Sequence, residues 1–349
     1  MIDLRSDTLT MPDHEMLESI LTSSFGDAGR LDKTGRGGDP TVNELEDYAA
    51  ELLKKEAAAF LCSGTMGNSA ALLTWCRPHD KVVIDRMNHT YRTEQFVFEP
   101  RFGQVEAVFC ECSPDGFPVP ESVERIMKTE KIRVLQLENT HNAHGGRCMP
   151  IELHKRLYEI ARRHGAKVHL DGARLFNAAL GLGVQVHEIA RYADSVMFCV
   201  SKGLGAPFGS LVCGDRSFIH ELRQTQKHLG GGMRQAGVMA APALYALKNL
   251  TPGLREDHIR ARKMADGLQN LKHLKPQEPV ETNLVMLEMK DVDAEVYCEK
   301  LMERGVLAGP VDGNRVRLVL YRGISDDDVE RAVQIMRTLD GEIIHSKHV

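Results

Sequence analysis

The feature that most limits the fold of this chain is a series of short apolar runs separated by segments of helical periodicity. Six such runs lie at residues 57–61, 81–85, 105–109, 134–139, 167–171 and 195–200. Between two of them, the segment 150–166 repeats apolar residues at the spacing of one helix face. Strands that alternate with helices predict an α/β fold with a mostly parallel sheet covered by helices. Ligands of such folds bind beyond the carboxyl ends of the strands, so we look for the site there.

The pattern changes near residue 250, where a long helical stretch leads to two further strand-like runs and a last helix. Ser325 and Asp328 at the start of that helix have the spacing of a capping box. A chain of 349 residues, 42% of them hydrophobic, is long enough for one large and one smaller domain. We therefore predict an N-terminal arm at 1–20, a large ligand-binding domain at 21–250 and a small α/β domain at 251–349.

Charge and cysteine content exclude several classes of partner. The net charge of -5 is spread without long blocks of one sign, so neither nucleic acid nor a membrane surface is expected. No apolar run approaches the roughly 18 residues of a membrane span, and the first residues lack the pattern of a signal peptide. The eight cysteines include no Cys-x-x-Cys pair, which favours reduced thiols, no metal site and a cytoplasmic protein. The expected partner is a small molecule.

A glycine-rich turn, Ser63-Gly64-Thr65, follows the first apolar run and precedes an apolar helical pattern. Free N–H groups at a helix start, together with the hydroxyls of Ser63 and Thr65, would suit a phosphate group. An ordinary helix cap is the alternative interpretation. The turn has neither the Walker spacing nor Gly-x-Gly-x-x-Gly, so a nicotinamide-dependent dehydrogenase is not favoured.

Two ionisable residues stand at the ends of later runs. Asp171 ends the run 167–171, and a buried carboxylate there needs a partner. That partner is either Arg174, in a structural salt bridge, or the protonated ring nitrogen of a ligand. His169 lies on the same side of the strand, and we interpret it as a packed core histidine.

Lys202 follows the run 195–200 and is surrounded by glycines and small residues. A lysine in dry surroundings can become a nucleophile that attacks an aldehyde. A phosphate turn, a strand-end carboxylate and a strand-end lysine together predict a site for pyridoxal 5'-phosphate (PLP). A scaffold that kept this fold but lost catalysis would not be expected to carry all three.

The chain resembles the low-specificity L-threonine aldolases, which are fold-type I PLP enzymes of the β-eliminating lyase superfamily. The resemblance is carried by the motifs IDLRSDTLT, GDPTVNELE, SGTMGN, LENTHN, HLDGARLFNAA, SKGLGAPFGS and GGGMRQAG. It implies the aspartate aminotransferase fold, with a mostly parallel seven-stranded sheet and a smaller C-terminal α/β domain. It also implies PLP-dependent cleavage of L-threonine, L-allo-threonine and related β-hydroxy-α-amino acids to glycine and an aldehyde. The alternative activity is elimination of a β-substituent from serine, cysteine or an aromatic amino acid.

The resemblance implies roles for individual residues in cofactor binding. Lys202 would be the Schiff-base lysine, Asp171 the partner of the ring nitrogen, and His89 the residue stacked on the ring and a candidate base, with a simple loop cap as its alternative. The cofactor-binding residues implied in all are Ser63, Gly64, Thr65, His89, Asp171, Arg174, Lys202 and Arg234. Arg234, with Lys227, would reach the cofactor of a neighbouring subunit, so a homo-oligomer, dimer or tetramer, with a shared site is implied.

The substrate carboxylate would be bound by Ser6, Arg174 and Arg317, because the arginine fork donates two parallel hydrogen bonds to a carboxylate. Arg322 is an alternative anchor. Three departures from the family surround the substrate more than the cofactor: the loop 27–38 replaces a tyrosine-containing segment, a His-Phe pair before LENTHN is absent, and Leu320-Tyr321 replaces Thr-His.

Overall fold

The structure, a computed structural model, describes residues 1–346. Seven strands form its central sheet in the order β2-β8-β7-β6-β5-β3-β4. Their bounds are β2 Ala57–Leu61, β3 Lys81–Ile84, β4 Glu106–Phe109, β5 Ile132–Glu138, β6 Lys167–Asp171, β7 Ser195–Cys199 and β8 Ser210–Gly214. Four of the six neighbouring pairs are parallel, and only β8 runs against its neighbours β2 and β7. The predicted mostly parallel sheet is therefore confirmed, and all six apolar runs form strands of it.

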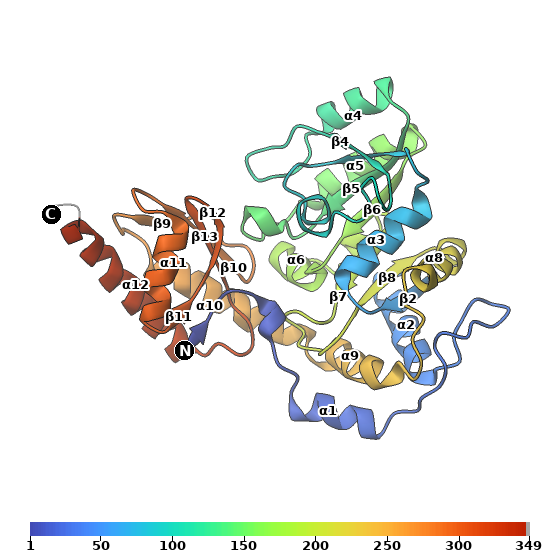
Figure 1. Cartoon of the computed structure of the whole chain (residues 1–349), viewed down its shortest axis with the longest axis horizontal. Coiled ribbons are helices and arrows are strands. Elements are labelled where there is room, and N and C mark those ends of the chain that lie inside the picture. The colour runs from blue at the N-terminus through green and yellow to red at the C-terminus, as the bar shows by residue number, and fades with distance from the viewer. Residues whose placement is uncertain (347–349) are drawn as a thin grey trace.

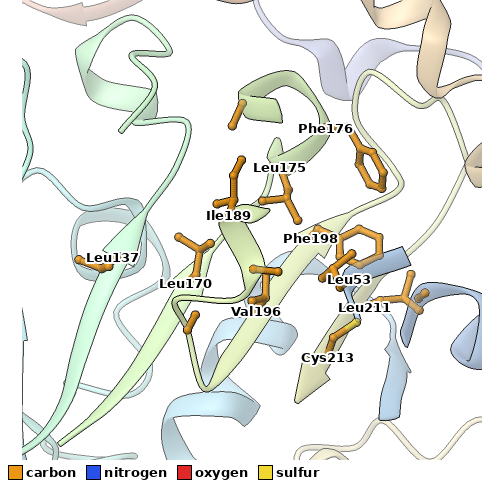
Figure 2. Close-up of a cluster of buried hydrophobic side chains, with 14 of the residues drawn as sticks. Leu53, Leu137, Leu170, Leu175, Phe176, Ile189, Val196, Phe198, Leu211 and Cys213 are labelled. Atoms are coloured by element: carbon orange, nitrogen blue, oxygen red, sulfur yellow. The ribbon is translucent and has the colours of Figure 1, made fainter. Parts of the chain in front are cut away.

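Helices cover both faces of this sheet (Figure 1). Those of the first 250 residues are α1 His14–Leu21, α2 Pro40–Leu53, α3 Gly64–Trp75, α4 Pro120–Thr129, α5 Ile151–Arg163, α6 Leu175–Leu182, α7 Val186–Ala190, α8 Arg216–His228 and α9 Gly237–Asn249. Alternate strand residues enter different clusters: Phe198 packs in the large cluster drawn in Figure 2, whereas Met197 and Cys199 pack with residues of α3 and α8. Burial on both faces explains why these strands are continuous apolar runs and not alternating patterns.

The C-terminal part is built on an antiparallel sheet of order β12-β13-β10-β9. Its elements are α10 Leu254–Gly267, β9 Leu274–Pro276, β10 Leu284–Met289, α11 Ala294–Glu303, β11 Val306–Leu307, β12 Gly309–Asp312, β13 Arg315–Val319 and α12 Asp326–Ser346. The predicted capping box is confirmed, because the Asp328 N–H donates to the Ser325 hydroxyl and the Ser325 N–H donates to the Asp328 carboxylate.

The first residues of the chain lie with this C-terminal part. Strand β1 (Ile2–Asp3) pairs with β11, and Ile2 and Leu4 belong to the C-terminal hydrophobic cluster, whereas α1 packs on α9 (Figure 1). The segment between them forms the short 3-10 helix η1 (Asp7–Leu9), which lies where the two parts of the molecule meet. The domain boundaries at residues 20 and 250 stay predictions.

The sequence predicts reduced thiols, no metal site and no membrane span, and each expectation can be compared with residues 1–346. All eight cysteines are free thiols. Within this range no group of His, Cys, Asp and Glu side chains could hold a metal ion. Nor does any helix in it combine the length and apolarity needed to cross a membrane.

Candidate active site

The carboxyl ends of β2, β5, β6 and β7 meet at one edge of the central sheet, where ligands of α/β folds bind. The residues predicted from the sequence are distributed over this edge. Ser63, Gly64 and Thr65 follow β2, Asp171 ends β6, and Lys202 follows β7. A second group, carried by η1 and β13, approaches from the N-terminal segment and the C-terminal sheet.

The turn after β2 is a helix start with open donors. Ser63 is the N-cap of α3, and its hydroxyl accepts from the Met66 N–H at 3.1 Å, so the helix-cap interpretation is correct for this side chain. The N–H groups of Gly64 and Thr65 belong to the first turn, which has no acceptor within the helix. A Cβ at Gly64 would lie 2.8 Å from Cys199 Sγ of β7, so only glycine allows this close approach. The turn therefore keeps free N–H groups against the sheet edge and fits a phosphate.

Asp171 is buried, and it forms no ion pair with an arginine of the described residues. One of its oxygens accepts from Asn68 Nδ2 at 2.9 Å and from the Thr90 hydroxyl at 3.5 Å, and the other accepts from the Ala173 N–H at 3.0 Å. Of the two alternatives for its partner, the salt bridge with Arg174 is wrong, because Arg174 pairs with Asp7, 167 residues earlier in the chain. Asp171 therefore lacks a cationic side-chain partner among the described residues, which suits a protonated ring nitrogen.

The surroundings of Asp171 include residues that the sequence analysis did not select. Asn68 of α3 joins Asp171 to His169, whose Nε2 lies 3.2 Å from Asn68 Oδ1 and whose Nδ1 lies 2.8 Å from the Ser195 hydroxyl. Burial lowers the pKa of His169 to about 4, so the prediction of a packed, neutral core histidine is confirmed. Glu94 also accepts from Asn68 Nδ2, at 3.0 Å, and burial together with the charge of Asp171 raises its pKa to about 7.

His89 starts the short π-helix η2 (Thr90–Glu94), but its imidazole makes no capping hydrogen bond. The loop-cap alternative is therefore wrong for this side chain. Burial lowers the pKa of His89, and the charges of Lys202 and Arg174 act in the same direction against that of Asp171. The imidazole thus lies among the other candidate residues and is neutral near pH 7.

Lys202 lies in the irregular segment between β7 and β8. Its amine makes no hydrogen bond and no ion pair with any residue of the described range. Gly205, whose N–H donates to the Lys202 carbonyl, has φ +77°, which a side chain would strain. The segment therefore presents a free amine close to Asp7, His89 and Glu94, whose pKa values respond to its charge.

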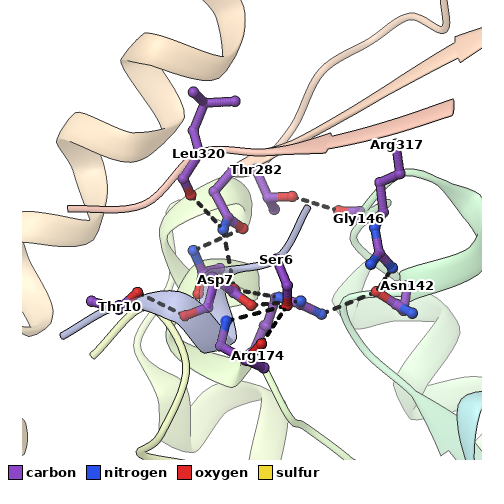
Figure 3. Close-up of polar contacts among 12 residues, drawn as sticks. Ser6, Asp7, Thr10, Asn142, Gly146, Arg174, Thr282, Arg317 and Leu320 are labelled. Carbon is purple, nitrogen blue, oxygen red and sulfur yellow. Dashed lines mark hydrogen bonds and ion pairs between the residues drawn. The ribbon is translucent and has the colours of Figure 1, made fainter. Parts of the chain in front are cut away.

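Arg174 and Arg317 form the second group (Figure 3). Arg174 Nε and NH2 donate to the two oxygens of Asp7 at 2.6 and 2.8 Å, and its NH1 donates to Asn142 Oδ1 at 3.2 Å. Arg317 NH1 donates to the same Asn142 oxygen at 2.8 Å. Burial and the charge of Arg174 lower the pKa of Arg317 to about 10. Arg317 is a largely buried cation without an acidic partner in residues 1–346, which is the setting of an anion site.

Three other residues predicted from the sequence, Ser6, Arg322 and Arg234, all within the described range, form no hydrogen bond or ion pair with Arg174 or Arg317. Ser6 precedes Asp7 in the chain, and its hydroxyl accepts from the Thr8 hydroxyl at 2.8 Å. Arg322 pairs with Asp13 at 3.0 Å and so has an acidic partner, which Arg317 lacks. Arg234 has a side chain that is 61% exposed and pairs with Asp27 of the loop 27–38 at 3.1 Å. The expected contact of Arg234 with the cofactor of a partner subunit stays a prediction.

The residues present fit PLP. The first turn of α3 fits its phosphate, Asp171 its ring nitrogen and the free Lys202 amine its aldehyde. The group of Asp7, Arg174, Asn142 and Arg317 fits the carboxylate of an amino acid. The sequence indicated the α3 start, Asp171 and Lys202 clearly, because each lies at or just after the end of a strand. It indicated Asn68, Glu94 and Asn142 only weakly, and these residues are identified by their contacts.

Comparison with known proteins gives concordant results. The family model described as β-eliminating lyase matches residues 3–292. The low-specificity L-threonine aldolase 1 of Arabidopsis thaliana is 39% identical over 342 residues, covering 94% of this chain and 93% of that protein. The low specificity L-threonine aldolase of Escherichia coli (strain K12) is 38% identical over 340 residues, covering 94% and 96%. The structure of a Leishmania major threonine aldolase superimposes with a TM-score of 0.81 at 18% identity, covering 97% of this chain and 100% of that one.

Proposed function

The chain belongs to the β-eliminating lyase family, and on this premise we propose that it is a PLP-dependent aldolase acting on β-hydroxy-α-amino acids. It cleaves L-threonine and L-allo-threonine to glycine and acetaldehyde, and related substrates to glycine and the corresponding aldehyde. The observation that carries the proposal is the meeting of the α3 start, Asp171 and the free Lys202 amine at one sheet edge, next to an arginine that is largely buried and has no acidic partner among the residues that the structure describes. The relatives named threonine aldolase, at 38–39% identity over nearly the whole chain, support this substrate class.

The cofactor-binding residues have distinct tasks in this proposal. Ser63, Gly64 and Thr65 would hold the phosphate, the Lys202 amine would hold the aldehyde end, and Asp171 would hold the protonated ring nitrogen. Bound in this way, PLP would supply an electron sink for cleavage of the Cα–Cβ bond. Asn68 keeps the Asp171 carboxylate in place for this contact.

Substrate binding and proton transfer rest on the second group. Arg317, Arg174 and Ser6 bind the α-carboxylate and so fix the direction of the Cα–Cβ bond. His89, whose pKa is lowered by burial, would accept the proton of the β-hydroxyl on an imidazole nitrogen. The aldehyde then leaves, and a proton returned to Cα completes glycine.

We also propose that the site is shared between subunits of a dimer or tetramer, with Arg234 reaching the cofactor of the partner. Exposed apolar side chains on and near α1 and α9, among them Leu17, Leu21, Phe25 and Met239, support an interface there. The eight free thiols support a cytoplasmic role, in threonine breakdown and glycine formation. The domain limits proposed remain 1–20, 21–250 and 251–349.

Product analysis tests the proposed function. The purified protein is supplied with PLP and L-threonine, and acetaldehyde is followed through an alcohol dehydrogenase that oxidises NADH. Glycine and acetaldehyde in equal amounts are expected. Formation of pyruvate and ammonia from L-serine or L-cysteine, without aldehyde from L-threonine, would instead establish the β-eliminating activity and refute the proposal.

A further inference from the structure

One amide oxygen joins the two arginines of the candidate carboxylate site. Asn142 Oδ1 accepts from Arg317 NH1 at 2.8 Å and from Arg174 NH1 at 3.2 Å, and Figure 3 shows it between their side chains. The arginines come from distant elements, since Arg174 precedes α6 and Arg317 lies in β13. Asn142 Oδ1 is therefore an acceptor shared by one arginine that follows the central strand β6 and one arginine of the C-terminal sheet.

The charge balance around this oxygen is uneven. The charge and hydrogen bonds of Arg174 lower the pKa of Asp7 in spite of its burial, so Asp7 is ionised and balances Arg174. Arg317 has only neutral acceptors, the Asn142 oxygen and the Arg5 carbonyl, and its buried Nε has no hydrogen-bond partner. Because the shared acceptor is an amide and not a carboxylate, one positive charge is left for a ligand.

The turn that carries Asn142 is itself fixed from several directions. The Asn142 N–H donates to Glu138 Oε1 at 2.8 Å, and the other oxygen of this buried carboxylate accepts from the His89 N–H at 2.8 Å. On the other side, Arg315 NH1 donates to the Ala143 carbonyl at 3.2 Å. The position of the Asn142 amide is thus tied to the backbone of His89 and to β13, so it cannot adjust freely when a ligand binds.

We propose that Asn142 is a positioning residue for the substrate carboxylate. Its neutral amide oxygen holds the two guanidinium groups at one point and leaves the charge of Arg317 to the ligand. The proposal rests on the proposed function, since it deepens the recognition of an α-amino acid at that site. Asn142 acts through the arginines, so its removal weakens the binding of ligands that carry a carboxylate and leaves the binding of those that lack one nearly unchanged.

Three variants of the holoenzyme separate positioning from a structural role. Asn142→Ala removes the acceptor, and Asn142→Asp keeps an oxygen in its place but adds a charge. The surface variant Asn249→Ala, whose amide only donates to a carbonyl of its own helix, is the matched control. Binding of glycine and of glycinamide, which lacks the carboxylate, is measured by calorimetry, along with kcat, KM and the melting temperature.

We expect Asn142→Ala to weaken glycine binding and to raise KM for L-threonine by about 10- to 100-fold, the loss typical of hydrogen bonds to charged groups. Its affinity for glycinamide should change less than about threefold, and its kcat should fall far less than KM rises. Asn142→Asp should melt no lower than the wild type but bind glycine at least about tenfold more weakly, because the added charge competes with the ligand for Arg317. Asn249→Ala should match the wild type.

Equal losses of glycine and glycinamide affinity in Asn142→Ala would overturn the proposal, as would wild-type glycine binding by Asn142→Asp. The second variant decides the matter if the first does not fold. A wild type that binds glycine more tightly than glycinamide but releases no aldehyde from L-threonine would refute the proposed function alone. A wild type that binds neither ligand would overturn both.

Discussion

Replacing each of the two arginines of the carboxylate site should affect the stability of the protein to very different extents. Arg317→Gln removes a largely buried cation that has no acidic partner in the described part of the chain. Burial and the charge of Arg174 lower its pKa to about 10, and this decrease corresponds to roughly 3 kcal/mol against the charged form. The cost is fully present below pH 10 and disappears only as the pH rises above this value, so it applies at neutral pH. The two lost hydrogen bonds offset most of it, and we expect the unfolding free energy to change by at most about 1 kcal/mol.

Arg174→Gln should be costly instead. It leaves the Asp7 carboxylate fully buried with Asn283 Nδ2, at 3.2 Å, as its remaining side-chain donor. Breaking one half of a buried ion pair costs about 3–5 kcal/mol. With an unfolding entropy of about 2.1 cal/mol/K per residue, 349 residues give a decrease in melting temperature of about 4–7 °C. Both variants should raise KM for L-threonine by about 10- to 100-fold.

The assay is thermal unfolding of both variants and the wild type at the same saturating cofactor concentration, since bound cofactor shifts the melting temperature. Steady-state kinetics with L-threonine are measured on the same preparations. A decrease in melting temperature for Arg317→Gln as large as that for Arg174→Gln would refute the account of Arg317 as a cation that only a ligand balances.

Two other predictions concern stability. The raised pKa of Glu94 means that the folded chain without cofactor holds a proton that the unfolded chain releases above about pH 4.5, so stability should fall as the pH rises from about 5 to 7. Glu94→Gln should lose less stability over this range, and an identical pH dependence of the melting temperature in variant and wild type would contradict the assignment. Ser325→Ala removes the N-cap of α12 and should cost about 1 kcal/mol, or about 1–2 °C, without changing kcat or KM. An unchanged melting temperature would mean that this cap does not limit stability.

The parallel strands and the cofactor side of the site could be predicted because both depend on local patterns. Each parallel strand is an apolar run, and the phosphate turn, Asp171 and Lys202 lie at or just after the ends of such runs, so their meeting at one edge follows from the parallel sheet. Strand β8 was missed because its five residues directly follow the glycine-rich Lys202 segment and have no helical segment before them. A short run in that position resembles the end of a loop.

Pairings across long stretches of chain could not be predicted. Arg174 was one of two possible partners for Asp171, three residues away, but the structure gives it Asp7, and no sequence period links Arg174 to Asp7. Asn142, Glu138 and Glu94 likewise have roles that depend on which loops meet after folding. Local sequence determines which strand, helix or turn carries a side chain. Its partner depends on how the N-terminal segment and the C-terminal sheet pack against the central sheet.

The central claim is that Lys202 holds PLP between Asp171 and the first turn of α3. Reduction of the yellow holoenzyme with borohydride, followed by proteolysis and mass spectrometry, tests it most directly. We expect the pyridoxyl group on the peptide that contains Lys202, and a Lys202→Ala variant that neither retains the cofactor after reduction nor cleaves L-threonine. Pyridoxyl modification of a different lysine, or a Lys202→Ala variant with wild-type turnover, would contradict the account.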